Sequence, residues 1–363
     1  MTPSTASDDS TATDASTGSR SILAMTPAPP RAPAAIAAAW GLHLGAAADS
    51  TRTSAHHHDP LREVDVALRA TDGVMLAASV FEPRAARAVA LVAPATGVPR
   101  GFYRAFARWL AAAGYAVITL DYRGIGGSRG PGPLRQSASM VDWMQRDLPA
   151  LLTAAQRRAA QATEPLALLW VGHSLGGHAL AQLPQLEQID AAIGVAAQLP
   201  SHQLWPRLHQ RWGARFFFEI WVPACVRLFG RLPGWAIGGG EDLPSAAALD
   251  WSRWGQMPGY FTGDPQVDVT ADRWRGVAHL WWIEDDWVFG PRDAVNALAQ
   301  TLAAGSGRAE VRPVAARDLG LRRLGHFGPF RRHAGERLWP LMLQEIESAV
   351  PRLRGTALTA APG

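Results

Sequence analysis

The stretch Leu166-Ala-Leu-Leu-Trp-Val-Gly-His-Ser-Leu-Gly-Gly177 decides the fold, because it joins an apolar run to a glycine-rich turn. The apolar run predicts a buried strand. A short helical segment follows to about Leu183, where Pro184 ends it. A strand, a G-x-S-x-G turn and a helix in this order are typical of a nucleophile elbow, which is so tight that small residues must flank the serine. We therefore predict that Ser174 stands above a sheet edge as a nucleophile, and is not an incidental serine in a turn.

Strand-like and helix-like segments alternate on both sides of this turn. Seven further strands are expected at residues 64–68, 74–81, 88–93, 116–120, 191–197, 277–283 and 310–314, and helices at 101–113, 140–160, 291–304 and 336–350. The first two strands flank Thr71-Asp-Gly73, a turn signal that predicts a hairpin. The alternation that follows predicts an α/β fold, a mostly parallel, doubly wound sheet with helices on both faces.

The chain divides by composition into a folded part and two terminal segments. Residues 1–60 are rich in Ala, Ser, Thr and Pro, and predict a disordered or low-complexity extension. Residues 61–350 form the expected domain, and residues 351–363 a C-terminal tail. Within the domain, residues 200–270 interrupt the alternation and hold six tryptophans. We expect this Trp-rich insertion to be a cap that covers the site with an apolar wall.

Charge and cysteine content exclude several classes of protein. The net charge is +4, with 35 basic and 31 acidic residues, so nucleic acid is not an expected partner. A single cysteine, Cys225, excludes an internal disulfide and a multi-cysteine zinc site. The three adjacent histidines at 56–58 are in a polar segment, where solvation is a better interpretation than metal binding. No run has the length of a membrane span, no signal peptide is recognised, and we expect a cytoplasmic protein that does not contact membranes.

A serine hydroxyl needs a base and an acid that orients the base. On a doubly wound sheet both come from loops at the carboxyl ends of later strands. The strand at 277–283 ends in Glu284-Asp-Asp-Trp287, and the last strand is followed by a loop that contains His326 between glycines and aromatic residues. We predict His326 as the base and Asp286 as the acid, with Asp285 as the alternative acid.

Two backbone amides are expected to stabilise the oxyanion of the reaction. One belongs to Leu175, at the start of the helix after the serine. The other belongs to Ala95 or Thr96, in the turn after the strand at 88–93, and the sequence does not choose between them. The glycine-rich segment Asp121-Tyr-Arg-Gly-Ile-Gly-Gly-Ser128 has Arg129 where a nucleotide-binding fingerprint would need a glycine. We expect neither a cofactor nor a metal, and interpret this segment as a loop beside the site.

These motifs resemble the α/β-hydrolase superfamily over about residues 61–350. More narrowly, they resemble a bacterial group of α/β hydrolases that is often labelled serine aminopeptidase S33-like. The segments that carry this likeness are 94–103, 121–128, Gly172-His-Ser-Leu-Gly-Gly177, 240–244, 318–321 and 325–328. The resemblance implies an eight-stranded sheet, the triad Ser174, Asp286 and His326, and no cofactor. Trp287 departs from the proline that many relatives carry directly after the second aspartate.

The sequence therefore predicts a serine hydrolase that cleaves a small-molecule ester through an acyl-enzyme. One alternative is a peptidase or an acyltransferase with the same triad. A peptidase that binds a free amine needs acids near the site, for which Glu219, Glu241, Asp242 and Asp250 are the candidates. The other alternative is a binding module without catalysis, for which an intact Ser, Asp and His would have no use. Acyl length and oligomeric state are left open by the sequence.

Overall fold

The protein is described by a computed structural model that covers residues 32–45, 61–130 and 138–353. All of these residues belong to one unit of the chain, Arg31–Gly363. Histidines 56–58, considered above as a metal site, lie outside the described residues, as does most of the expected tail after residue 350.

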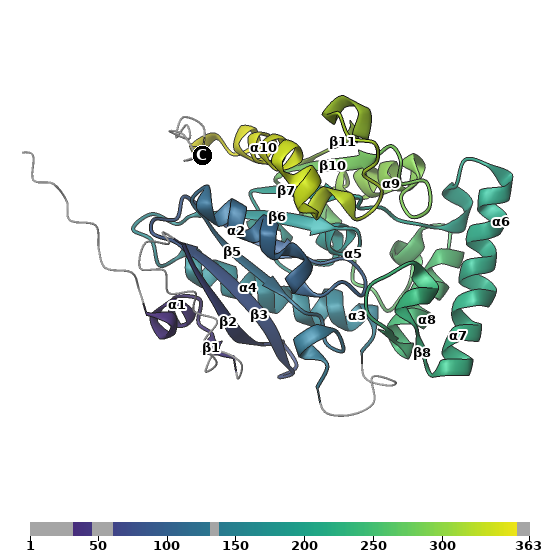
Figure 1. Ribbon diagram of the computed structural model, residues 1–363, viewed down its shortest axis with the longest axis horizontal. Coiled ribbons are helices and arrows are strands. Elements are labelled where there is room, and N and C mark those ends of the chain that lie inside the picture. Colours follow the sequence, from purple (N-terminus) through teal and green to yellow (C-terminus); the bar gives the residue numbers. More distant parts are fainter. Residues whose placement is uncertain (1–31, 46–60, 131–137, 354–363) are drawn as a thin grey trace, which may run out of the picture. The chain divides into compact units, whose positions relative to one another are not determined.

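A nine-stranded sheet forms the centre of this unit (Figure 1). The strands run in the order β1-β2-β3-β5-β4-β6-β7-β10-β11. Their bounds are β1 His43–Leu44, β2 Leu61–Arg69, β3 Met75–Pro83, β4 Ala88–Ala93, β5 Tyr115–Leu120, β6 Ala167–His173, β7 Ala191–Val195, β10 Val277–Ile283 and β11 Arg308–Val314. Strands β1 to β3 pair antiparallel, as do β3 and β5, and all later pairs are parallel. The predicted mostly parallel sheet is confirmed, and β1 adds a ninth strand to the eight expected.

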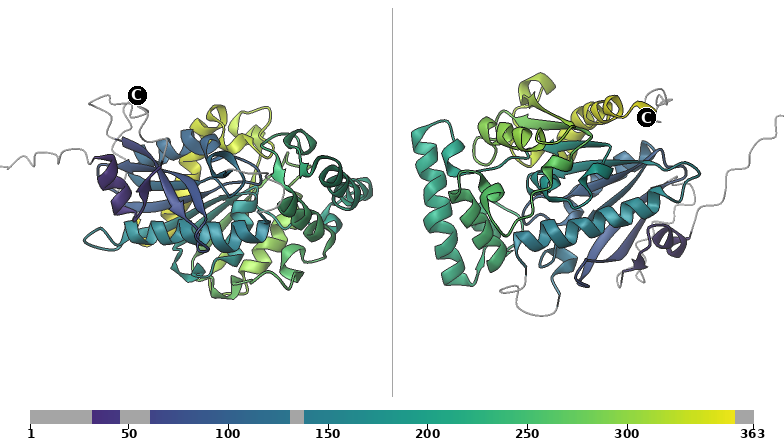
Figure 2. Two further views of the ribbon diagram at one scale, coloured as in Figure 1. Left: turned by 90° about the horizontal axis from the view of Figure 1, so that it is seen from below. Right: turned by 180° about the vertical axis from the view of Figure 1, so that it is seen from behind.

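Helices cover both faces of the sheet (Figure 2). Their bounds are α1 Pro33–Ala39, α2 Arg104–Ala112, α3 Met140–Asp142, α4 Leu148–Ala159, α5 Leu175–His178, α6 Leu208–Phe216, α7 Val222–Phe229, α8 Ser245–Gln256, α9 Arg292–Leu302 and α10 Arg332–Ala349. Strand β4 shows why the sheet needs helices on both of its faces. Val89 and Leu91 enter the core shared with α4 and α9, while Ala90 and Val92 enter the core shared with α2 and α10. A fully apolar strand is thereby buried on both faces.

The predicted long helix over residues 140–160 is divided near its middle. Helix α3 passes through a π-helical turn, Trp143–Asp147, into α4, and Pro149 lies in the first turn of α4. Proline has no N–H to donate to the preceding turn, and the π-helical turn directly before it interrupts the regular α-helical hydrogen-bond pattern at this point. The division places Asp147 in the core, where its carboxylate accepts hydrogen bonds from the side chain of Arg123 at 2.6 and 2.8 Å.

The glycine-rich loop after β5 is braced as expected by Asp121 and Arg123. The Asp121 carboxylate accepts from the backbone N–H groups of Arg100 and Gly127 at 2.6 and 2.8 Å. Arg123 pairs with both Asp147 and Asp72. Because these charges are partly or fully buried and each has a partner, removing one of them would leave the other uncompensated.

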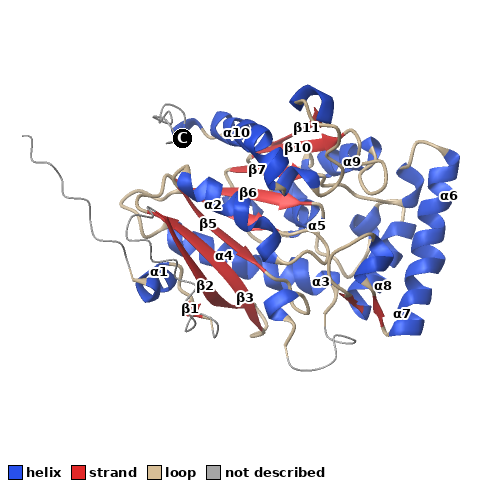
Figure 3. Cartoon of the chain, viewed as in Figure 1, coloured by secondary structure: helices blue, strands red, loops and turns tan. Residues whose placement is uncertain are grey.

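Between β7 and β10 the chain forms an insertion that is mostly helical (Figure 3). It contains α6, α7, α8 and a two-stranded ribbon of β8 Arg231–Leu232 and β9 Leu243–Pro244. Its six tryptophans range from buried to exposed, and Trp221 is half-buried. Trp205, Trp251 and Trp254 are buried, whereas Trp212 and Trp235 are 59% and 65% exposed. We refer to residues 200–270 as the insertion.

The prediction that residues 1–60 form a disordered or low-complexity extension is wrong for residues 33–44. Helix α1 packs on the sheet and β1 pairs antiparallel with β2. Trp40 is fully buried, and its indole N–H donates to Glu82 at 3.0 Å. Only a few apolar side chains between alanines carry this docking, which explains why composition alone indicates low complexity.

We predict that Trp40→Ala lowers the free energy of unfolding by about 3 kcal/mol or more, because it empties a buried aromatic site and leaves Glu82 without one donor. Urea denaturation of the full chain measures this. The matched control is Trp235→Ala, at an exposed position, which should change stability by less than about 0.5 kcal/mol. Equal small effects of both substitutions would contradict the docking of α1.

Candidate active site

Ser174 occupies a strained turn between β6 and α5. Its φ is 51° and its ψ is −114°, a conformation that residues with a side chain rarely adopt. The flanking glycines are required by close contacts. A Cβ atom on Gly176 would lie 2.1 Å from the carbonyl oxygen of Ala93, and one on Gly172 would lie 2.4 Å from the carbonyl oxygen of Gly176. The predicted tight strand-to-helix turn is therefore present. Contact with the end of β4 excludes a larger residue at Gly176, and contacts within the turn exclude one at Gly172.

The turn is also fixed by backbone hydrogen bonds to both neighbouring strands. The N–H of Ser174 donates to the carbonyl of Val195 at the end of β7, at 2.9 Å. The N–H of Gly176 donates to the carbonyl of Pro94 after β4, at 3.1 Å. The amide of Leu175 belongs to the first turn of α5, where helical N–H groups lack partners within the helix.

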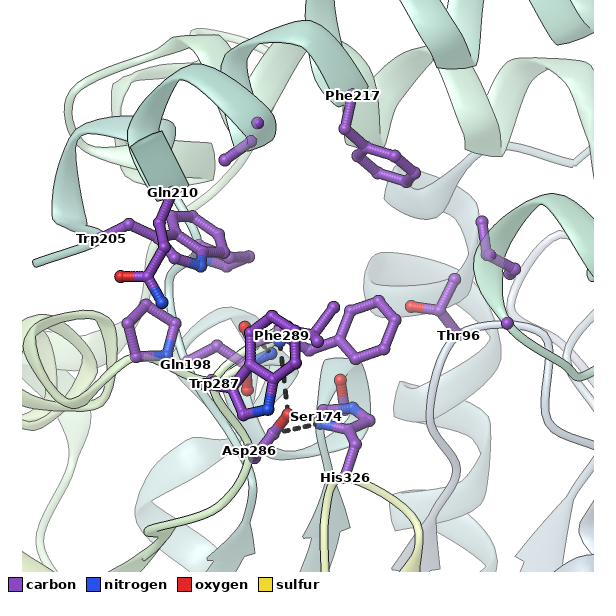
Figure 4. A pocket seen from close by; sticks show the side chains of 18 of the residues that line it. Thr96, Ser174, Gln198, Trp205, Gln210, Phe217, Asp286, Trp287, Phe289 and His326 are labelled. Carbon is purple, nitrogen blue, oxygen red and sulfur yellow. Dashed lines mark hydrogen bonds and ion pairs between the residues drawn. The ribbon is translucent and has the colours of Figure 1, made fainter. Parts of the chain in front are cut away.

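His326 and Asp286 meet below the pocket that Ser174 lines. The Nδ1 atom of His326 lies 2.5 Å from Oδ2 of Asp286, and both side chains are more than 90% buried. The other oxygen of Asp286 accepts from the backbone N–H of Phe289 at 3.3 Å. Ser174, Asp286 and His326 all line one cavity (Figure 4). The structure thus brings together the three residues that the sequence singled out.

Asp285, the alternative acid, has a different set of partners. Its two carboxylate oxygens accept from the backbone N–H groups of Leu324 and Gly325, both at 2.8 Å. Gly325 has a φ of +57°, which suits glycine. Asp285 therefore holds the loop that carries the histidine, while Asp286 contacts the imidazole itself.

A buried hydrogen-bond chain connects the turn after β4 with the histidine loop. The Ala95 N–H donates to Tyr103 Oη at 2.8 Å, and Tyr103 Oη lies 2.8 Å from His173 Nδ1. His173 Nε2 lies 2.9 Å from the carbonyl oxygen of His326. Since a carbonyl only accepts, Nε2 carries the proton and Nδ1 accepts from the tyrosine hydroxyl. Burial keeps the pKa of His173 well below its usual value, which matches this neutral form.

This hydrogen-bond network bears on which backbone amide, that of Ala95 or that of Thr96, can serve as the second oxyanion donor. The N–H of Ala95 is already engaged by Tyr103, so Thr96 is the remaining candidate of the two. The sequence analysis did not identify Tyr103. No local motif could have revealed it, because its partners lie 8 and 70 residues away along the chain. His173 packs beneath the pocket and is fully buried.

The cavity above these residues has a volume of about 1200 Å³. Its walls come from the sheet edge and from the insertion, and include a group of aromatic side chains: Trp205, Phe217, Trp251, Tyr260, Trp282 and Phe289. The cavity volume exceeds the usual range of about 300–1,000 Å³ for small-molecule sites. The cavity can therefore hold an organic substrate with a sizeable apolar part.

The insertion acids proposed for amine binding have other partners. Glu219 pairs with Arg215, Glu241 with Arg129, Asp242 with Arg231 and Asp250 with Arg253. Within the described part of the chain, these four acids are not among the residues that line the cavity.

The described residues contain no cluster of three or more His, Cys, Asp or Glu side chains that could hold a metal ion. Over the same residues, no helix combines the length and the apolar character that crossing a membrane requires.

Comparison with known proteins supports one fold. Residues 84–233 match the family model described as serine aminopeptidase, S33. The structure resembles an esterase from Pyrococcus furiosus with a TM-score of 0.51 and 14% sequence identity, covering 79% of this chain and 91% of that one. The chain has the α/β-hydrolase fold. The matched segment contains Ser174 and its turn, and ends before Asp286 and His326.

Two further structures resemble this protein. A soluble variant of monoglyceride lipase from Saccharomyces cerevisiae, in complex with a substrate analogue, gives a TM-score of 0.54 and 14% identity over 78% of this chain and 95% of that one. An acylaminoacyl peptidase from Pyrococcus horikoshii gives 0.51 and 11% identity over 84% of this chain and 44% of that one. Comparison with curated protein sequences gives no match. At such low identity these likenesses establish the fold alone.

The buried His178 predicts a loss of stability in acid. Burial lowers the pKa of His178 from 6.5 to about 3, so the unfolded chain binds a proton between these values that the folded chain does not. Stability due to neutral His178 is therefore full above pH 6.5 and is lost as the pH falls towards 3.

We predict that this residue contributes about 2 kcal/mol to the drop in unfolding free energy between pH 7 and pH 5. Urea denaturation of wild type and His178→Phe at both pH values measures the difference between their drops. The same drop in both proteins would show that His178 is not held neutral.

Proposed function

We propose that this hydrolase cleaves a carboxylic ester through an acyl-enzyme, with Ser174 as nucleophile, His326 as general base and Asp286 as the orienting acid. The observation that carries the proposal is the buried contact of 2.5 Å between His326 Nδ1 and Asp286 Oδ2, in the same cavity as a serine on a strained elbow. A histidine with a purely structural role would not need both a buried carboxylate at its Nδ1 atom and a serine in the same cavity.

The chemistry follows from the tautomer that Asp286 selects. Its carboxylate accepts a hydrogen bond from the Nδ1–H of His326, so Nε2 is left with a lone pair. Nε2 takes the hydroxyl proton as Ser174 Oγ attacks the ester carbonyl carbon. The proton then passes to the departing alkoxide as the acyl-serine forms. In the second half, His326 removes a proton from water, the hydroxide attacks the acyl carbon, and the acid leaves as the proton returns to Ser174.

The charge that develops on the carbonyl oxygen needs N–H donors that are already in place. We assign this role to the backbone amides of Leu175 and Thr96. Leu175 follows the serine in the first turn of α5, and Thr96 lies in the turn after β4 and lines the same cavity as the serine. Loss of one such donor typically costs about 100-fold or more in rate.

Ester cleavage is favoured over removal of an amino-terminal residue by the charges around the cavity. An aminopeptidase needs an acid that holds the substrate ammonium group. The four insertion acids pair with arginines and are not among the cavity-lining residues that the structure describes, and Glu284, which does line the cavity, pairs with Arg317 at 2.6 Å. The aromatic wall suits an apolar acyl or alcohol group. Two of the similar structures are an esterase and a monoglyceride lipase.

We predict that wild type hydrolyses p-nitrophenyl esters and that Ser174→Ala lowers kcat by at least about 10⁴-fold, because the covalent route is lost. A spectrophotometric assay over acyl chains of increasing length, with aminoacyl nitroanilides in parallel, measures this. Ser348→Ala, an exposed serine on α10, is the matched control and should retain wild-type activity.

Each other outcome of this assay contradicts part of the proposal. Turnover of the nitroanilides without turnover of the esters would indicate a peptidase. Ester turnover that survives in Ser174→Ala would place the reaction elsewhere, and no turnover of either substrate class would favour a binding module.

A further inference from the structure

One continuous helical segment forms the outer edge of the insertion (Figures 1 and 2). Helix α6, a π-helical turn over Phe217–Trp221 and helix α7 follow one another without a break from residue 208 to residue 229. One side of this segment packs on α8. Phe218 and Val222 are buried there, and the hydroxyl of Ser252 donates to the carbonyl of Phe218. We refer to residues 208–229 as the outer helix.

The opposite side of the outer helix carries large apolar side chains that are exposed. Trp212, Phe216 and Ile220 follow one another at intervals of four residues, a spacing that places side chains on one face of a helix. They are 59%, 53% and 56% exposed. Leu208 and Leu228, near the two ends of the outer helix, are 69% and 75% exposed.

This apolar surface continues beyond the end of α7. Phe229 and Trp235 are both exposed, and their ring centroids lie 6.0 Å apart. Of the 14 large hydrophobic side chains that are exposed among the described residues, seven therefore lie within residues 208–235. Apolar side chains gathered in this way mark an interaction site, whereas scattered ones need no explanation. We call these seven the apolar face: Leu208, Trp212, Phe216, Ile220, Leu228, Phe229 and Trp235.

The charges around the apolar face are almost all positive. Residues 207–229 contain four arginines and one acid, Glu219, a net charge of +3 with histidine neutral. Glu219 pairs with Arg215 at 2.8 Å. Arg207 and Arg227 are exposed and form no ion pair with any described residue. An apolar helix face with arginines around it is complementary to a lipid surface that carries negative charge.

A second copy of the chain fits this surface less well than a lipid bilayer does. A two-fold symmetric contact places the same surface of both copies face to face. Two outer helices, each with a net charge of +3, would then lie against each other. Like charges that meet across an interface oppose association. Anionic headgroups, in contrast, attract each arginine that comes near them.

We propose that the outer helix docks this protein on the surface of bilayers that contain anionic lipids. The apolar face enters the boundary between headgroups and acyl chains, and the arginines lie at the level of the phosphates. The sequence predicts no membrane contact, because no run has the length of a span. A helix that lies in the plane of the surface needs no such run.

The inner side of the same helix connects this surface with the candidate active site. Gln210, Gly213 and Ala214 of α6 line the cavity, as does Phe217 from the π-helical turn. One helix thus presents one side to the proposed bilayer and another side to the cavity that contains Ser174. Docking would bring the cavity to a source of apolar esters. This consequence for the substrate rests on the proposed esterase function, whereas docking itself does not.

Co-sedimentation of the full-length protein with sucrose-loaded vesicles tests the docking without turnover. One set of vesicles contains phosphatidylcholine alone, and the other contains phosphatidylcholine with about 30% phosphatidylglycerol. We expect the protein to bind the anionic vesicles about 10-fold or more strongly, because several arginines lie close to the surface. About 0.5 M NaCl should remove most of this preference, since exposed charges are screened.

A double variant, Trp212→Ser with Ile220→Ser, tests the apolar face. Neither residue is among those that line the cavity, and both are exposed, so the fold should persist. Binding to the anionic vesicles should fall about 10-fold or more, because less apolar surface enters the bilayer. The matched control is Leu44→Ser with Leu341→Ser, two exposed leucines of β1 and α10, which should change binding less than about 2-fold.

A second variant, Arg227→Gln, tests the charges. It should weaken binding to the anionic vesicles about 5-fold and leave binding to neutral vesicles nearly unchanged. Arg84→Gln makes the same change of charge at an exposed position in the turn between β3 and β4, and should have almost no effect. Circular dichroism of each variant verifies that it is folded.

The results either support or overturn the docking, whether or not the protein hydrolyses esters. Binding to anionic vesicles that both the serine variant and Arg227→Gln weaken supports it, even for a protein that turns over no ester. No binding to either set of vesicles, or binding that neither variant weakens, overturns it. A dimer seen by analytical ultracentrifugation and lost in the serine variant, without vesicle binding, would assign the apolar face to a second copy and also overturn the docking.

Discussion

The close contact between the serine turn and the ends of its neighbouring strands is the constraint on which the rest of the site depends. Ser174 is held at φ 51° because Gly172 and Gly176 let α5 approach β4 and β6 to distances that a Cβ atom would not allow. Its amide is tied to β7 and that of Gly176 to the turn after β4. The local strain is thus offset by hydrogen bonds and packing from three strands, which fix the hydroxyl before any substrate binds.

The same strand ends also position the other parts of the proposed reaction. Tyr103 and His173 connect the amide of Ala95 with the carbonyl of His326, so the turn after β4 and the histidine loop share one buried network. Asp285 holds the histidine loop from its other side through two backbone amides. Protonation of His173 would remove the acceptor at Nδ1 and so break the hydrogen bond from Tyr103. Burial of His173 lowers its pKa and disfavours that charged form. Rigid placement of base and donors is what an acyl-transfer site requires.

The sequence predicted those parts of the site that depend on local pattern. Apolar runs such as β4 and β6 indicated buried strands, and the glycines around Ser174 identified the elbow. Strand ends led to Asp286 and His326, which lie in contact in the structure. Local pattern could not choose between Ala95 and Thr96. The choice depends on the hydroxyl of Tyr103, in the turn before α2, which accepts from the Ala95 N–H. Nor could it detect that residues 33–44 dock on the sheet, since few apolar side chains carry that contact.

The central claim is that Ser174 is a nucleophile activated through His326 and Asp286. The most direct measurement is the rate at which a fluorophosphonate probe labels the chain, with the modified peptide identified by mass spectrometry. Our account predicts an adduct on Ser174 in wild type, and labelling that is slower by about 10³-fold or more in Asp286→Asn. Asp285→Asn should slow it far less, because Asp285 contacts only the loop. No adduct on Ser174, or equal rates in the wild type and Asp286→Asn, would contradict the account.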